Sequence, residues 1–131
     1  MKLFKLSTAV LALTMMLFTA CKSKSPKDLI VNKWKVTDVS GDGAKGMTDA
    51  DKKQMMDKFV MEFTKDGKCS VSGMGETPKT GTYTVSDDGK TLNLTREGDT
   101  KPSPQEISEL TADKLVITDG DSKMKITFSP K

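Results

Sequence analysis

The stretch Phe59-Val60-Met61-Glu62-Phe63-Thr64-Lys65-Asp66-Gly67-Lys68-Cys69-Ser70-Val71 decides the fold of this chain. On both sides of Asp66-Gly67, apolar residues recur at every second position, which is the period of a strand with one buried face. An Asp-Gly pair between two such runs is a strong signal for a tight antiparallel turn. The stretch therefore predicts a β-hairpin.

The same pattern recurs in both directions along the chain. Asp88-Gly89 separates two further alternating runs, and Asp119-Gly120 precedes a last run in which Met124, Ile126 and Phe128 alternate with polar residues. Upstream, Trp34 and Val36 lie on one side of an alternating segment. Successive hairpins of this kind form a meander. The predicted strands begin near residues 30, 59, 68, 80, 90, 105, 114 and 123.

A helix interrupts the strands after the first one. Thr48 can accept a hydrogen bond from a free backbone amide, and Asp49 and Asp51 favour the positive end of a helix dipole. Few apolar residues follow before Val60, so the predicted helix over residues 48–58 is short and weakly amphipathic. It must pack against the sheet to persist.

Antiparallel strands with one apolar face each must close on themselves or pair as two sheets, because an open sheet leaves exposed edges. A barrel of eight strands has an interior that side chains just fill or that holds one small ligand. We therefore predict an all-β chain: an eight-stranded antiparallel up-and-down barrel, or a flattened one, over residues 29–131. The short helix lies between strands one and two.

The first 20 residues have the pattern of a signal peptide. Lys2 and Lys5 precede an apolar run over residues 6–20. This run is 15 residues long (20 − 5), whereas a helix that crosses a bilayer needs about 20. Cleavage after Ala20 would place the bulky Phe18 third from the new end, which disfavours ordinary secretion. We predict that residues 1–20 form an N-terminal signal helix.

The segment Thr19-Ala20-Cys21 resembles a bacterial lipobox, with Phe18 where leucine is usual. The resemblance implies that Cys21 is acylated, with palmitate for example, and holds the protein on a membrane through its acyl chains. Residues 21–28 then form the lipidated cysteine and a polar tether, in which a proline discourages helix. An uncleaved anchor and ordinary secretion are the alternatives. Lys22 implies, by resemblance to sorted lipoproteins, an outer membrane location facing the periplasm.

The amino-acid composition limits the kinds of partner and site that we expect in this chain. Without residues 1–20 the chain has 19 basic residues (21 − 2) and 18 acidic ones, so we expect no nucleic-acid partner. The chain has no histidine, which removes the commonest general base and metal ligand. Cys69 is the only cysteine besides Cys21, and an inert thiol is favoured. We predict no enzyme activity, catalytic residue, metal or cofactor; a catalytic role would need several carboxylates or lysines in one cleft.

Residues 29–129 resemble the lipocalin-like domain lipoproteins of Gram-negative bacterial envelopes. The likeness rests on the lipobox and tether, on Trp34 in the first strand, and on Asp-Gly hairpins such as Phe63–Lys68 followed by Gly81–Val85. True lipocalins carry a glycine two positions before that tryptophan, where this chain has Asn32. The resemblance implies a lipocalin-like barrel with a ligand-binding shape.

Side-chain size indicates where a ligand could lie. Cys69, Val71, Gly73 and Gly81 are small inward residues between rows of large ones, so either large side chains lean into the gap or a pocket remains. Packing density favours the first. Our first hypothesis is a barrel that binds a small apolar or amphipathic molecule. Its predicted lining is Phe59, Met61, Tyr83, Met124 and Phe128, with Met55 and Met56 near the mouth. The helix over residues 48–58, which carries these two methionines, would be the lid.

Our second hypothesis is a non-catalytic structural or protein-interaction module with a filled core. It would bind an envelope protein partner through its loops at residues 40–48 and 96–104. Trp34 is expected to plug the core in either case, since a large buried aromatic is more often a packing residue than a ligand contact.

Overall fold

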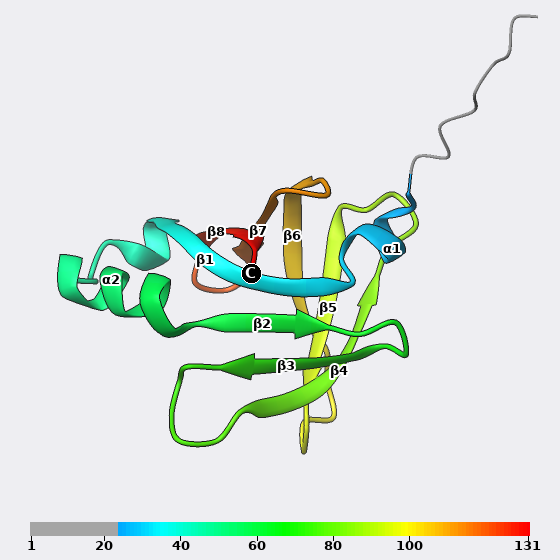
Figure 1. The fold of residues 1–131 in the computed structure, drawn as a ribbon, viewed down its shortest axis with the longest axis horizontal. Coiled ribbons are helices and arrows are strands. Elements are labelled where there is room, and N and C mark those ends of the chain that lie inside the picture. The colour runs from blue at the N-terminus through cyan, green and yellow to red at the C-terminus, as the bar shows by residue number, and fades with distance from the viewer. Residues whose placement is uncertain (1–23) are drawn as a thin grey trace, which may run out of the picture.

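The alternating segments form eight antiparallel strands that close into a barrel (Figure 1). The computed structural model describes residues 24–131, so the predicted signal helix over residues 1–20 and Cys21 lie outside the described residues. Each strand pairs with the next in sequence, and β8 pairs with β1. The strands are β1 (Asn32–Gly41), β2 (Val60–Phe63), β3 (Lys68–Ser72), β4 (Lys79–Val85), β5 (Thr91–Arg96), β6 (Ser103–Leu110), β7 (Leu115–Asp119) and β8 (Met124–Pro130). The predicted fold class is confirmed.

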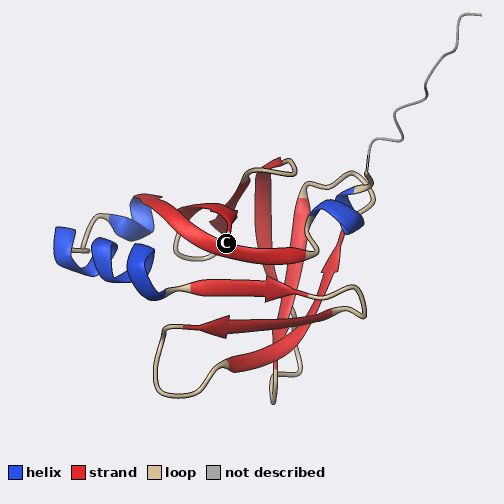
Figure 2. Ribbon diagram, in the orientation of Figure 1, coloured by secondary structure: helices blue, strands red, loops and turns tan. Residues whose placement is uncertain are grey.

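Helices lie at the two ends of this barrel wall (Figure 2). They are α1 (Pro26–Leu29), the 3-10 helix η1 (Asp42–Ala44) and α2 (Asp49–Lys58). Helix α2 lies between β1 and β2, as predicted, and Thr48 caps it.

Helix α1 corrects the predicted tether. The expectation that a proline discourages helix over residues 21–28 is wrong for residues 26–28, which are helical. Pro26 occupies the first turn of α1, where its missing N–H costs nothing. Ser25 caps the helix by accepting from the amide of Asp28. Lys27 Nζ lies 3.1 Å from a carboxylate oxygen of Asp87 in the turn after β4. The chain is therefore already part of the domain at Ser25.

The alternation predicted for β1 breaks at one point. The pairing register with β8 shifts between Val36 and Asp38, so Val39 becomes buried and Asp38 exposed. A β-bulge of this kind bends a strand and increases its twist, which helps a sheet to close. A second shift occurs in β6 between Ile107 and Glu109.

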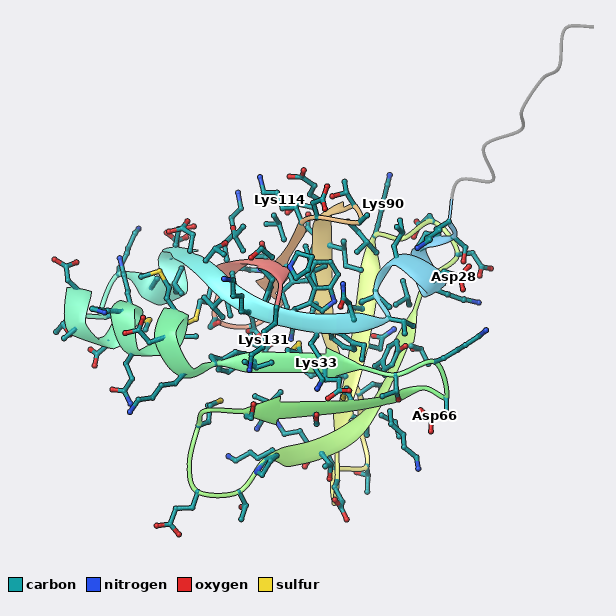
Figure 3. All side chains as sticks on the ribbon, in the orientation of Figure 1. Asp28, Lys33, Asp66, Lys90, Lys114 and Lys131 are labelled. Carbon is teal, nitrogen blue, oxygen red and sulfur yellow. The ribbon has the colours of Figure 1, made fainter. Side chains whose placement is uncertain are left out.

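One end of the barrel is closed by side chains. The tight turns β2–β3, β4–β5 and β6–β7 gather there together with α1, and Figure 3 shows Asp28, Asp66, Lys90 and Lys114 at these connections. Trp34 is fully buried, and its Nε1–H donates to the carbonyl oxygen of Ile30 over 2.9 Å. The other fully buried large side chains are Phe63, Phe128, Ile30, Leu92 and Leu115. Trp34 thus plugs the core, as predicted.

The opposite end is open and carries α2, η1 and the β3–β4, β5–β6 and β7–β8 loops. All eight strands and the buried hydrophobic core of the described chain lie between residues 30 and 130, so a chain that begins at Lys22 retains the whole barrel. Within residues 24–131, no helix is long and apolar enough to cross a bilayer.

Candidate ligand cavity

A cavity of about 370 Å³ lies inside the barrel towards the open end. Its walls come from β2 to β8 and from α2, and most of its lining is apolar. The apolar lining residues are Met55, Phe59, Met61, Cys69, Val71, Met74, Leu94, Ile117, Met124, Ile126 and Phe128. The barrel interior is therefore filled at the closed end and hollow near the other.

Small residues on β3 and β4 create this space. Cys69 pairs with Phe63 on one side and with Gly81 on the other, and Val71 pairs with Met61. Gly81 adds no side chain, and a Cβ built there would meet the carbonyl oxygen of Thr95 on β5. The expectation that large side chains lean in and fill the gap is wrong, because the neighbouring large residues have partners of their own.

Five of the seven predicted ligand residues meet around the cavity: Phe59, Met61, Met124, Phe128 and Met55. The rings of Phe59 and Phe128 lie 6.4 Å apart between centroids. These five residues come from β2, β8 and the C-terminal part of α2 with its cap Phe59, which agrees with the predicted geometry, in which α2 lies near the mouth.

Tyr83 lies outside the cavity lining, contrary to the sequence-based prediction. Its ring stands edge-on to Phe63, with centroids 4.8 Å apart, and its hydroxyl donates to the carbonyl oxygen of Thr64 over 2.7 Å. Burial, with smaller effects of Cys69 and Asp66, raises the pKa of Tyr83. Met56 packs against the core and does not line the cavity either. Tyr83 therefore stands in the barrel wall beside Phe63, and Met56 holds α2 against the core.

Sequence reasoning missed the polar part of the lining, which includes Lys79, Arg96, Gln105 and Asp119. Strand alternation could have indicated the two cations. Lys79 lies two residues before the inward-facing Gly81 on β4, and Arg96 lies two residues after the inward-facing Leu94 on β5. For Asp119 the sequence pattern predicts only a turn. It does shape that turn, but its carboxylate also lines the cavity.

Asp119 is held by four donors. Gln105 Nε2 donates to one carboxylate oxygen over 2.8 Å, and the backbone amide of Ser122 donates to the other over 2.7 Å. The Ser122 hydroxyl and the Asp121 amide donate to that second oxygen as well. These bonds lower the pKa of Asp119 to about 2, and the bond from the Ser122 amide has the largest effect on it.

An outer groove of about 610 Å³ lies in front of the cavity. Its lining is Gly46, Met47, Asp51, Gln54, Met55, Phe59, Gly73, Met74 and Gly75, so Met55, Phe59 and Met74 belong to both spaces. Met74 is 60% exposed and stands between two glycines with positive φ. Helix α2 and the β3–β4 loop therefore flank the entrance.

The thiol of Cys69 is half-buried against the cavity, and burial raises its pKa. A raised pKa keeps a thiol protonated and weakly nucleophilic. In residues 24–131, no group of three or more metal-binding side chains gathers.

Comparison with known proteins agrees with the fold. A lipocalin-like protein from Bacteroides uniformis ATCC 8492 superimposes with a TM-score of 0.57 at 15% identity, over 79% of this chain and 99% of its own. A duf4847 family protein from Bacteroides vulgatus ATCC 8482 gives 0.54 at 15% identity, over 77% and 93%. A further protein from Bacteroides uniformis ATCC 8492, solved by NMR, gives 0.52 at 20% identity, over 82% and 92%.

No curated protein matches the sequence. The model of the lipocalin-like domain family matches residues 30–117, which span β1 to the middle of β7. This match covers about two-thirds of the chain, and it includes the closed end and much of the cavity wall. The chain belongs to the lipocalin-like domain family.

Proposed function

We propose that this protein binds a small apolar or amphipathic molecule inside its barrel. The observation that supports the proposal is the cavity of about 370 Å³, closed at one end by Trp34 and Phe63 and open at the other beside α2. Ligand pockets span roughly 300–1,000 Å³ and are mostly apolar with a few polar groups. The cavity meets each of these conditions.

The lining is also suited to adapt to a ligand. Met55, Met61, Met74 and Met124 contribute flexible thioether side chains to the cavity. Methionine adjusts to irregular apolar shapes more readily than branched or aromatic residues do. The site is therefore suited to apolar ligands of several shapes and not to a single rigid ligand.

We further propose that the protein is non-catalytic and is anchored at Cys21 to the outer membrane, facing the periplasm. The proposal rests on the lipobox-like segment Thr19–Cys21 and on the short apolar run before it. The first described helix begins at Pro26, so only a few residues separate Cys21 from the barrel domain. The barrel domain would then lie close to the membrane surface.

A cavity-filling variant tests ligand binding. Val71 lines the cavity, whereas Val60 lies on β2 next to the inward-facing Met61 and does not line it. In the chain from Lys22 onward, Val71→Phe should lower affinity for the neutral fluorophore N-phenylnaphthylamine by about tenfold or more, because the added ring occupies ligand space. Val60→Phe is the matched control and should retain wild-type affinity, as measured by fluorescence titration.

Cys69 provides a second readout in the same chain, where it is the only thiol. Bound fluorophore should slow alkylation of Cys69 by iodoacetamide, since the thiol lines the cavity. Absence of fluorophore binding by the wild type, or equal binding by both phenylalanine variants, would refute the proposal.

A further inference from the structure

We propose that the ligand is an amphiphile with an anionic head group, a carboxylate or a phosphate, that Lys79 and Arg96 hold at the mouth of the cavity. This inference rests on the proposed function, since it concerns the same cavity. It adds the chemical class of the ligand and the orientation in which the ligand enters.

The two cations stand on neighbouring strands at the open end. Lys79 is the first residue of β4 and Arg96 the last residue of β5, and both line the cavity. Arg96 pairs with Gly81, two residues along β4 from Lys79. Residues two apart share a face of a strand, so Lys79 and Arg96 lie on the same inner face as Gly81 and Leu94.

No carboxylate neutralises these cations in the part of the chain that the structure describes. The ion pairs of residues 24–131 involve other lysines, and none brings an acid within 4.0 Å of Lys79 or Arg96. Glu97, next to Arg96 in sequence, accepts from the hydroxyl of Thr80. The positive charge at the mouth thus lacks an internal partner.

Asp119 lines the same cavity, but its carboxylate is already engaged in hydrogen bonds with other residues. Both of its carboxylate oxygens accept hydrogen bonds, from Gln105 on one side and from Ser122 and Asp121 on the other. These donors face its negative charge and stabilise it in place. Asp119 keeps its negative charge at neutral pH, but within residues 24–131 it forms no ion pair with Lys79 or Arg96, so both cations stay available to an incoming anion.

Arg96 is the only arginine of the chain, whose other 20 basic residues (21 − 1) are lysines. A guanidinium is planar, weakly hydrated and able to donate two parallel hydrogen bonds to a carboxylate or phosphate. The apolar body of the ligand would lie behind it against Met61, Ile117 and Phe128. This combination favours an amphiphile over a wholly apolar molecule.

Four ligands with the same apolar chain test the proposal: decanoate, decyl phosphate, decanol and decylamine. Each displaces N-phenylnaphthylamine from the chain that begins at Lys22, at neutral pH and low salt. At least one of the two anions should bind about fivefold or more tightly than decanol, and decylamine should bind most weakly. Added salt should reduce the preference for the anion. The order of the two anions identifies the head group.

Substitutions of Arg96 and Lys79 test whether these residues cause the preference for an anionic head group. Arg96→Gln and Lys79→Gln should each weaken the preferred anion about fivefold and leave decanol unchanged. Lys35→Gln, on an exposed outward position of β1, is the matched control and should change neither. If decanol binds as tightly as both anions, or if the two variants do not affect anion binding, the inference is wrong while the apolar cavity stands. If the fluorophore does not bind at all, the proposed function itself fails.

Discussion

At the scale of single residues, Asp119 shows how one turn residue serves two purposes. Its carboxylate closes the β7–β8 turn through Ser122 and fixes Gln105 in the cavity wall. Gln105 is buried to 8% exposure, so its amide needs this partner. The turn and the polar edge of the cavity therefore depend on the same side chain.

Asp119 should make stability depend on pH. Its pKa falls from 3.8 to about 2 in the folded protein, so its contribution is complete above pH 3.8 and disappears as the pH falls through about 2. Asp119→Asn should lower the free energy of unfolding at neutral pH by about 1 kcal/mol after allowance for solvent screening. Urea titrations of both proteins should show this difference shrinking towards pH 2.

The control is Asp113→Asn, in the β6–β7 turn at the closed end, which should change stability by less than about 0.5 kcal/mol. A difference between wild type and Asp119→Asn that stays constant down to pH 2 would show that the charge of Asp119 is not responsible.

At the scale of elements, α2 is a short helix held by its cap. Thr48 Oγ1 accepts from the amide of Asp51 over 3.1 Å, and Asp51 Oδ2 accepts from the amide of Thr48 over 3.0 Å. No residue of α2 is buried, although Met55 and Met56 pack against the core. Helix α2 thus combines local capping with modest packing, which allows it to open locally.

Thr48→Ala should loosen the mouth of the barrel. Loss of an N-cap threonine costs about 1 kcal/mol. We expect faster amide exchange in α2 and faster release of N-phenylnaphthylamine, with exchange in β4 and β5 unchanged. Hydrogen exchange with mass spectrometry and stopped-flow fluorescence measure these two effects. Lys52→Ala, within the same helix, is the control and should leave the release rate unchanged; equal release from Thr48→Ala and wild type would contradict a lid role.

At the scale of the whole molecule, the chain enters the barrel at the closed end. Pro26 contacts the β4–β5 turn, since a Cβ on Gly89 would lie 2.8 Å from Pro26 Cγ, and Lys27 pairs with Asp87 there. Four residue steps separate Cys21 from Ser25, which reach at most about 14 Å. In the anchored protein that we propose, the closed end lies near the bilayer and the cavity mouth points away from it.

This orientation can be measured on the lipidated full chain in vesicles, with Cys69→Ser as the background. A fluorophore attached through Asp87→Cys should be quenched strongly by a quencher on lipid head groups, and one attached through Glu76→Cys, in the β3–β4 loop, only weakly. Cys21→Ser should abolish vesicle association, since two or more acyl chains provide the stable attachment. Equal quenching at both positions, or vesicle binding by Cys21→Ser, would contradict the proposal.

The sequence by itself determined the eight strands, their order and the capped helix, because alternation, Asp-Gly turns and N-caps act over a few neighbouring residues. It also placed Phe59, Met61 and Phe128 on one inner surface, since strand parity alone assigns them to it. Local patterns were insufficient for the bulge at Val36–Asp38, which depends on closure against β8.

Only the tertiary structure decided whether the barrel is hollow and which polar groups reach the cavity. The hydroxyl of Tyr83 bonds the carbonyl oxygen of Thr64 and lies outside the cavity lining. The polar lining residues include Lys79, Arg96, Gln105 and Asp119. These positions depend on the tilt of the strands and on contacts with residues distant in sequence. The order of residues along one strand specifies neither. The physical reason is that a cavity is a balance of side-chain volumes across several strands, and that balance exists only once the barrel has closed.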